Sequence, residues 1–296
     1  MRKDMLLPGL ALAGGALGLG LRQWHLSAAY DPVSQLFAAG HPAAYALPAL
    51  IGALALVFIL LLRGIPKPTS GAHAFRCPAS SFLTLMSASG LLFLAAGVLG
   101  LMEGMERLSL WRVDPSSQVF TYPAALILCA LLSLCAGPAT LLLGKVVCRG
   151  TDAPSLPLLV NVPAIAALVW LFATHMAHST DPILLGYVFS LAAAALLLLA
   201  HYYIAAFFHG RPHPLRCALS ALLGVTLALI SLADRPSLFG FVLTAALALS
   251  ALACCWALLR NTFGPPWPAR LLETRMPLGA QDDDGDDDDD EEDLFP

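Results

Sequence analysis

Residues 183–208 read ILLGYVFSLAAAALLLLAHYYIAAFF, an apolar run without one Asp, Glu, Lys or Arg. A helix needs about 20 apolar residues to cross the roughly 30 Å of hydrocarbon in a bilayer, so this run is long enough to span a membrane. Seven further runs have the same character, namely 5–21, 43–62, 82–102, 124–143, 156–174, 217–233 and 238–259. The sequence therefore predicts an all-α, polytopic transmembrane bundle of about eight helices.

The composition agrees with a membrane class. Hydrophobic residues make up 58% of the 296 residues and charged residues 12%, against roughly 25% charged residues in a soluble domain. The backbone must satisfy its own hydrogen bonds inside lipid, which helices do within one segment. The runs also lack the strand-like alternation of a β-barrel. We expect the lipid bilayer as the main partner, and no nucleic acid.

The cations give an orientation. Twelve Lys and Arg residues fall at one end of the helices and four at the other, where Arg22, Arg107, Arg112 and Arg235 lie. Cytoplasmic loops of membrane proteins carry an excess of Lys and Arg. The split therefore predicts both termini in the cytoplasm and a multi-pass protein of the plasma membrane.

Two loops look like copies of one another. Residues 31–37 read DPVSQLF after the first run, and residues 114–120 read DPSSQVF after the third. This match predicts duplicated helical hairpins and a first helix that is retained rather than cleaved as a signal peptide. Asp followed by Pro favours a type I turn, so Asp31-Pro32 and Asp114-Pro115 are expected to cap the two hairpins. Tyr30 would then face Phe37 across the first loop, and Val113 would face Phe120 across the second.

Small residues in the first run indicate close helix packing. Gly14 and Gly18 form a small-xxx-small pair, with Gly15 and Gly20 beside it. Such faces let helices approach closely in lipid. The glycine-rich face would pack within the bundle, against a second copy of the chain, or against a partner membrane protein.

Ionisable or strongly polar groups inside a membrane are the usual pointers to function. Asn161 and His201 are the two candidates within the apolar runs. A short loop joins their runs, which suggests similar depths in the bilayer, so the two side chains are expected to hydrogen bond. A ligand-binding role for this pair is the alternative.

The outer end is chemically richer. His175 and His178 are three residues apart at the end of one run, and Glu103 and Glu106 repeat that spacing at the end of another. On a continued helix each pair shares a face. With Asp31 they form a candidate polar cluster whose residue types suit a divalent metal. The cluster lacks any familiar metal-ligand motif, so no metal or cofactor is assigned.

The C-terminal region differs from the bundle. Residues 1–260 form the expected helical domain, 261–281 a Pro-rich cytoplasmic linker, and 282–296 an acidic tail. Eleven of the twelve residues from 282 to 293 are acidic. Such a run repels itself, which predicts disorder.

The repeated loop, together with DPILLGY at 181–187 and FFHGRP at 207–212, resembles a group of polytopic membrane proteins of anaerobic bacteria to which no activity is assigned. The resemblance implies the architecture alone. Three functional hypotheses follow from the residues. A structural or accessory membrane subunit needs only what is already seen and is favoured, with a small-molecule transporter or permease component, or a metal-dependent enzyme at the outer face, as alternatives.

Overall fold

The computed structural model describes residues 2–31, 36–38, 40–66, 68, 74–116, 119–150, 156–179, 183–268 and 271. In these residues the bundle prediction is confirmed: eight helices are long and apolar enough to cross a membrane. They are α1 (Lys3–Ala28), α2 (Pro42–Leu62), α4 (Ser80–Val113), α5 (Thr121–Arg149), α6 (Leu156–Ala177), α7 (Val188–Phe208), α8 (Pro214–Ser231) and α9 (Leu238–Phe263). Two short 3-10 turns, η1 (Leu184–Gly186) and η2 (Leu232–Asp234), precede α7 and follow α8.

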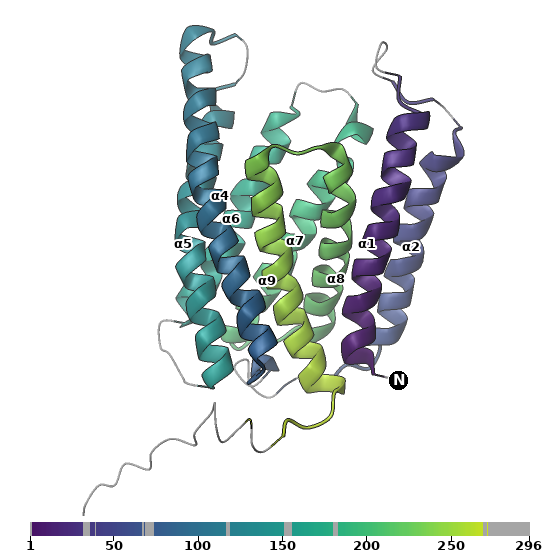
Figure 1. Cartoon of the computed structure of the whole chain (residues 1–296), viewed down its shortest axis with the longest axis vertical. Helices are drawn as coiled ribbons and strands as arrows, with labels where there is room; N and C mark the ends of the chain where they lie inside the picture. Colours follow the sequence, from purple (N-terminus) through teal and green to yellow (C-terminus); the bar gives the residue numbers. More distant parts are fainter. Residues whose placement is uncertain are drawn as a thin grey trace, which may run out of the picture.

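Neighbouring helices follow one another around the bundle. In the series α4, α5, α6, α7, α8, α1 and α2, each helix packs against the next. Helix α9 packs against α4, α8, α1 and α7. Figure 1 shows α4 extending beyond the other helices at the end of the bundle away from the N-terminus. We call this the distal end, and the end that carries Lys3 and Phe263 the proximal end.

Burial separates the central helices from the peripheral ones. Within the most apolar window of each span, 67% of residues are buried in α8 but 22% in α2. Helix α2 leaves Leu56, Ile59 and Leu60 exposed. In a membrane these side chains would meet lipid tails, which are as apolar as they are, so their exposure costs nothing.

Glycines set the closest helix approach. A Cβ atom built on Gly137 of α5 would lie 2.7 Å from Leu94 Cγ and 3.0 Å from the Gly90 carbonyl oxygen of α4. A Cβ on Gly90 would meet the Gly137 carbonyl oxygen at 3.1 Å. Only the absence of a side chain on both helices allows this spacing, which gives α4 and α5 an interlocked seam.

The glycine-rich face of α1 packs inside the bundle. Built Cβ atoms would meet Leu54 of α2 at Gly14, and Leu229 and Ile230 of α8 at Gly15 and Gly18. This face of α1 is therefore occupied by helices of the same chain.

Ion pairs join α1 to α9 at the proximal end. Asp4 is fully buried, and its Oδ2 lies 3.2 Å from Arg2 Nη2 and 3.8 Å from Arg260 Nε. The Arg260 guanidinium also lies 4.4 Å from the centre of the Trp267 ring, and Trp267 Nε1 donates to Asn261 Oδ1 at 2.8 Å. The start of the expected linker therefore folds back on the end of α9. Residues 282–296 lie outside the described part of the chain.

Candidate functional site at the distal end

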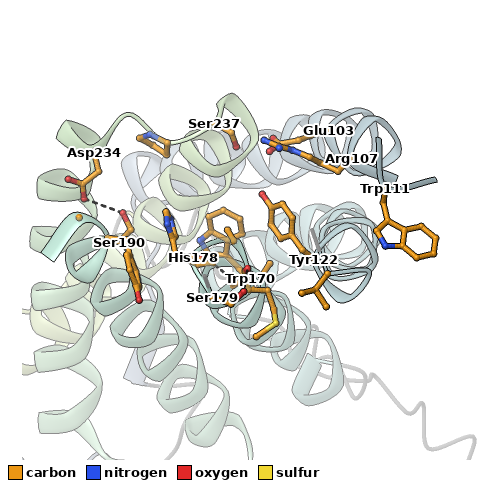
Figure 2. A pocket seen from close by; sticks show the side chains of 18 of the residues that line it. Glu103, Arg107, Trp111, Tyr122, Trp170, His178, Ser179, Ser190, Asp234 and Ser237 are labelled. Carbon is orange, nitrogen blue, oxygen red and sulfur yellow. Dashed lines mark hydrogen bonds between the residues drawn. The ribbon is translucent and has the colours of Figure 1, made fainter. Parts of the chain in front are cut away.

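A pocket of about 830 Å³ opens at the distal end, in the size range of small-molecule sites. Its walls come from α4, α5, α6 and α7, from the segment after α6, and from the η2–α9 connection. Aromatic and hydroxyl-bearing side chains dominate its lining, which includes Glu103, Arg107, Trp111, Phe120, Tyr122, Trp170, Thr174, His178, Ser179, Tyr187, Ser190, Asp234, Arg235 and Ser237. Figure 2 shows ten of the lining residues by name.

Asp234 lines one side of the pocket. Its Oδ2 accepts a hydrogen bond from Ser190 Oγ at 3.3 Å, the contact drawn in Figure 2. Its Oδ1 accepts from Arg22 Nε at 2.8 Å. Asp234 also borders a second hollow of about 970 Å³, which is lined in part by Trp24, Tyr30 and Phe37. The carboxylate thus lies between two cavities.

Arg22 is fully buried although it carries a charge. Besides the bond to Asp234, its Nη2 donates to the carbonyl oxygens of Leu185 and Gly186 at 2.9 and 3.2 Å. Its guanidinium lies 4.9 Å from the centre of the Phe189 ring. A buried cation is tolerated only where its donors are matched in this way. Arg22 therefore ties α1 to η1, α7 and η2 at one point.

The opposite wall is formed by α4 and α5. Glu103 and Arg107 lie one turn apart on α4, where Figure 2 shows their side chains next to each other. The Arg107 guanidinium lies 5.9 Å from the centre of the Tyr122 ring of α5. This wall combines a carboxylate, a cation and a phenol.

The floor of the pocket is closed by rings. Trp170 of α6 meets Phe239 of α9 edge to face, with 5.4 Å between ring centres. The Phe239 ring lies so close to Gly100 of α4 that a Cβ there would be 2.7 Å from it. Gly240 likewise leaves room for the Trp170 ring, which would lie 3.0 Å from a Cβ. Three helices therefore meet around two rings beneath the pocket.

The predicted polar cluster comes together only in part. His178 and Glu103 line the pocket, whereas His175, Glu106 and Asp31 are exposed and do not line it. Helix α6 ends at Ala177, so His178 leaves the helical face that it was expected to share with His175. The His178 ring stacks on Tyr187 instead, at 4.4 Å and 2°. No three His, Cys, Asp or Glu side chains of the described chain are placed to hold a metal ion.

The expected hydrogen bond between Asn161 and His201 is wrong. Asn161 Nδ2 lies 3.1 Å from His209 Nε2, which places Asn161 level with the end of α7. His201 is buried about two turns deeper, or about 12 Å at 1.5 Å per residue. Its Nε2 lies 2.9 Å from Ser250 Oγ, and its Nδ1 lies 2.8 Å from the Leu197 carbonyl oxygen.

The two repeated loops share a sequence but differ in structure. Tyr30 and Phe37 face each other, as expected, across an antiparallel bridge with ring centres 5.1 Å apart. In the second copy Val113 is the last residue of α4 and is 87% exposed, while the Phe120 ring packs 4.9 Å from Trp111. The facing pair expected there is therefore wrong, because α4 continues through it.

The Asp-Pro positions can be followed in one loop. Asp114 Oδ1 accepts from Ser116 N at 3.0 Å and from Ser116 Oγ at 2.6 Å, the contacts of an Asp-initiated turn. These two bonds lower the pKa of the Asp114 carboxyl below its ordinary value. Pro115 lies in this turn and borders the pocket, whereas Pro32 lies outside the described residues.

Sequence reasoning missed the Arg22–Asp234 pair. The apolar run ends at residue 21, so Arg22 reads as a loop cation, whereas α1 continues to Ala28. The signal present in the sequence was an arginine and a histidine, Arg22 and His25, one turn apart at a sparsely cationic end.

Comparison of the chain with protein-family models, curated proteins and solved structures finds no match.

Proposed function

We propose that this chain is a multi-pass protein of the plasma membrane with its proximal end in the cytoplasm, and that it serves as an accessory subunit that receives a ligand at its outer face. The split of twelve cations against four supports this orientation, because positive loops stay inside. Lys3 Nζ lies 5.0 Å from the Phe263 ring centre. The start of α1 and the end of α9 therefore lie on the same side of the bundle.

The distal pocket is the observation that carries the proposal. It has the volume of a ligand site, and its lining mixes aromatic faces with polar groups. The Trp170–Phe239 contact closes its floor, which favours binding at the outer end over passage through the bundle. A metal-dependent enzyme would need converging ligands, and of the five candidates only His178 and Glu103 share the pocket.

Two serine-to-cysteine variants test both the orientation of the chain in the membrane and the closure of the pocket floor. Ser237 lines the pocket, whereas Ser89 is buried in α4 and donates to the Ala246 carbonyl oxygen at 2.8 Å. A membrane-impermeant thiol reagent added to intact cells should modify Ser237→Cys and spare Ser89→Cys. The unsubstituted chain, with its seven cysteines, gives the background.

Each other result contradicts a part of the proposal. Modification of Ser237→Cys only after the cells are opened would place the distal end in the cytoplasm. Modification of Ser89→Cys from outside, at a rate near that of Ser237→Cys, would mean that water passes the floor. The permease alternative would then replace the accessory subunit. The feature that favours this alternative is the presence of prolines inside four of the described helices, namely Pro8, Pro48, Pro138 and Pro163.

A further inference from the structure

Both carboxylates that line the distal pocket have an arginine beside them, and a further arginine, Arg235, lines the pocket as an exposed residue. Asp234 is bound by the buried Arg22, and Glu103 has Arg107 on the next turn of α4. A cationic ligand would therefore meet carboxylates that already have a cation beside them, and would lose its own hydration in exchange. The arrangement therefore disfavours a cationic ligand.

Seven of the side chains that line the pocket carry hydroxyls. Ser190 Oγ donates its proton to Asp234, which leaves its lone pairs to accept. Ser237 Oγ accepts from the Gly240 amide at 3.2 Å, which leaves its own proton to donate. The Tyr122 phenol adds a group that does both. These groups suit a ligand whose own groups also donate and accept.

Flat rings complete the lining. The Trp170 ring is held from below by Phe239, and the Tyr122 ring is held beside Arg107. His178 and Tyr187 form a parallel stack whose planes differ by 2°. Fixed aromatic faces of this kind offer apolar area at little entropic cost. They suit a ring with an apolar face.

We propose that the distal pocket binds a glycosyl group. A sugar ring combines an apolar C–H face, which covers an aromatic ring, with a rim of uncharged hydroxyls that donate and accept. This inference rests on the proposed function, since the pocket must face outward to meet its ligand. The same group could come from a free oligosaccharide or from the headgroup of a glycolipid in the outer leaflet.

The test uses the full chain in phosphatidylcholine nanodiscs. Saturation-transfer NMR measures binding of free maltose, lactose and chitobiose. Native mass spectrometry measures retention of a monoglucosyl diacylglycerol against a phosphatidylglycerol. Binding of a free sugar, or preferential retention of the glucosyl lipid, is expected, and the two readouts separate the two sources. Failure of all four sugar probes overturns the inference.

Three variants test where the sugar binds. Tyr122→Phe keeps the ring and removes one hydroxyl, so it should weaken binding about fivefold. Trp170→Leu should weaken binding at least about tenfold. Trp256→Phe is the matched control, because Trp256 lies on α9 and does not line the pocket; it should leave binding unchanged. Equal losses in the control and in Tyr122→Phe would overturn the assignment to this pocket.

A charge test separates a sugar from a zwitterion. Glu103→Gln removes the charge and keeps the shape, so affinity for an uncharged sugar should change by less than about threefold. A loss above about tenfold, or displacement of the sugar by betaine, would overturn the inference. If Ser237→Cys is labelled from outside while no sugar binds, the glycosyl inference fails and the proposed function stands.

Discussion

Arg22 Nε and Asp234 Oδ1 lie 2.8 Å apart, with side chains that are 0% and 8% exposed. The two residues are 212 positions apart in the chain, on α1 and at the end of η2. Their contact fixes the first helix to the same carboxylate that borders the distal pocket. The shape of the pocket therefore depends on a helix that contributes no side chain to it.

Loss of Arg22 should be costly because it leaves Asp234 charged and without its cation. Arg22→Met is expected to lower the free energy of unfolding by about 3–5 kcal/mol, the usual effect of breaking a buried pair from one side. The double variant Arg22→Gln, Asp234→Asn removes both charges and should recover a large part of this loss. Unfolding in mixed micelles measures both. A double variant as unstable as the single one would show that the carbonyl contacts of Arg22 dominate instead.

Ser250 should matter more than Ser89, although both hydroxyl oxygens lie within hydrogen-bonding distance of the Ala246 carbonyl oxygen. Ser250 is also the partner of His201 Nε2, so Ser250→Ala leaves a buried ring nitrogen without its bond. We expect a loss of about 1–2 kcal/mol for Ser250→Ala, and less than about 0.6 kcal/mol for Ser89→Ala. Thermal unfolding in nanodiscs compares them. A larger loss of stability for Ser89→Ala would show that the bond to His201 does not determine the effect of Ser250→Ala.

The helices could be predicted from sequence because each depends on a local property. An apolar run such as 183–208 has to be helical in lipid, whatever its neighbours are. The end of a run is a poorer guide to the end of a helix. Helix α4 continues to Val113, well past the apolar run that ends at residue 102, and the extension carries Glu103, Arg107 and Trp111 into the pocket.

Which polar side chains pair with each other could not be predicted. The pairing depends on the relative depth of the helices and on residues that are distant in the chain. Asn161 and His201 were paired by assuming that a short loop keeps two helices level. The η1 turn and the late start of α7 at Val188 shift the register, which brings His209 to Asn161 instead. Periodicity likewise placed His178 beside His175, and the end of α6 at Ala177 separates them. Nothing local in the sequence marks either event.

The α4–α5 seam should be intolerant of side chains at its glycines. Gly137→Ala puts a Cβ 2.7 Å from Leu94 Cγ and 3.0 Å from a backbone oxygen, so the helices must move apart. We expect a loss of about 1–3 kcal/mol in unfolding free energy. Gly52 of α2 is the matched control, because a Cβ there meets nothing within 4 Å. Gly52→Ala should be neutral or stabilising by up to about 1 kcal/mol. Equal effects of the two changes would mean that the seam is looser than its geometry implies.

The turn at Asp114 should persist to unusually low pH. The Ser116 hydroxyl and amide both donate to this carboxylate and so hold its pKa below the ordinary value of about 3.9. A carboxyl with a lower pKa in the folded chain favours the folded turn at pH above its unfolded pKa, and this contribution is lost as the pH falls through the folded pKa. A carboxyl-carbon NMR titration should therefore find the pKa of Asp114 below its ordinary value. Ser116→Ala removes the hydroxyl donor and keeps the amide, so it should move the Asp114 pKa part of the way back. An Asp114 that titrates at its ordinary value, with no response to Ser116→Ala, would mean that the two hydrogen bonds do not form in solution.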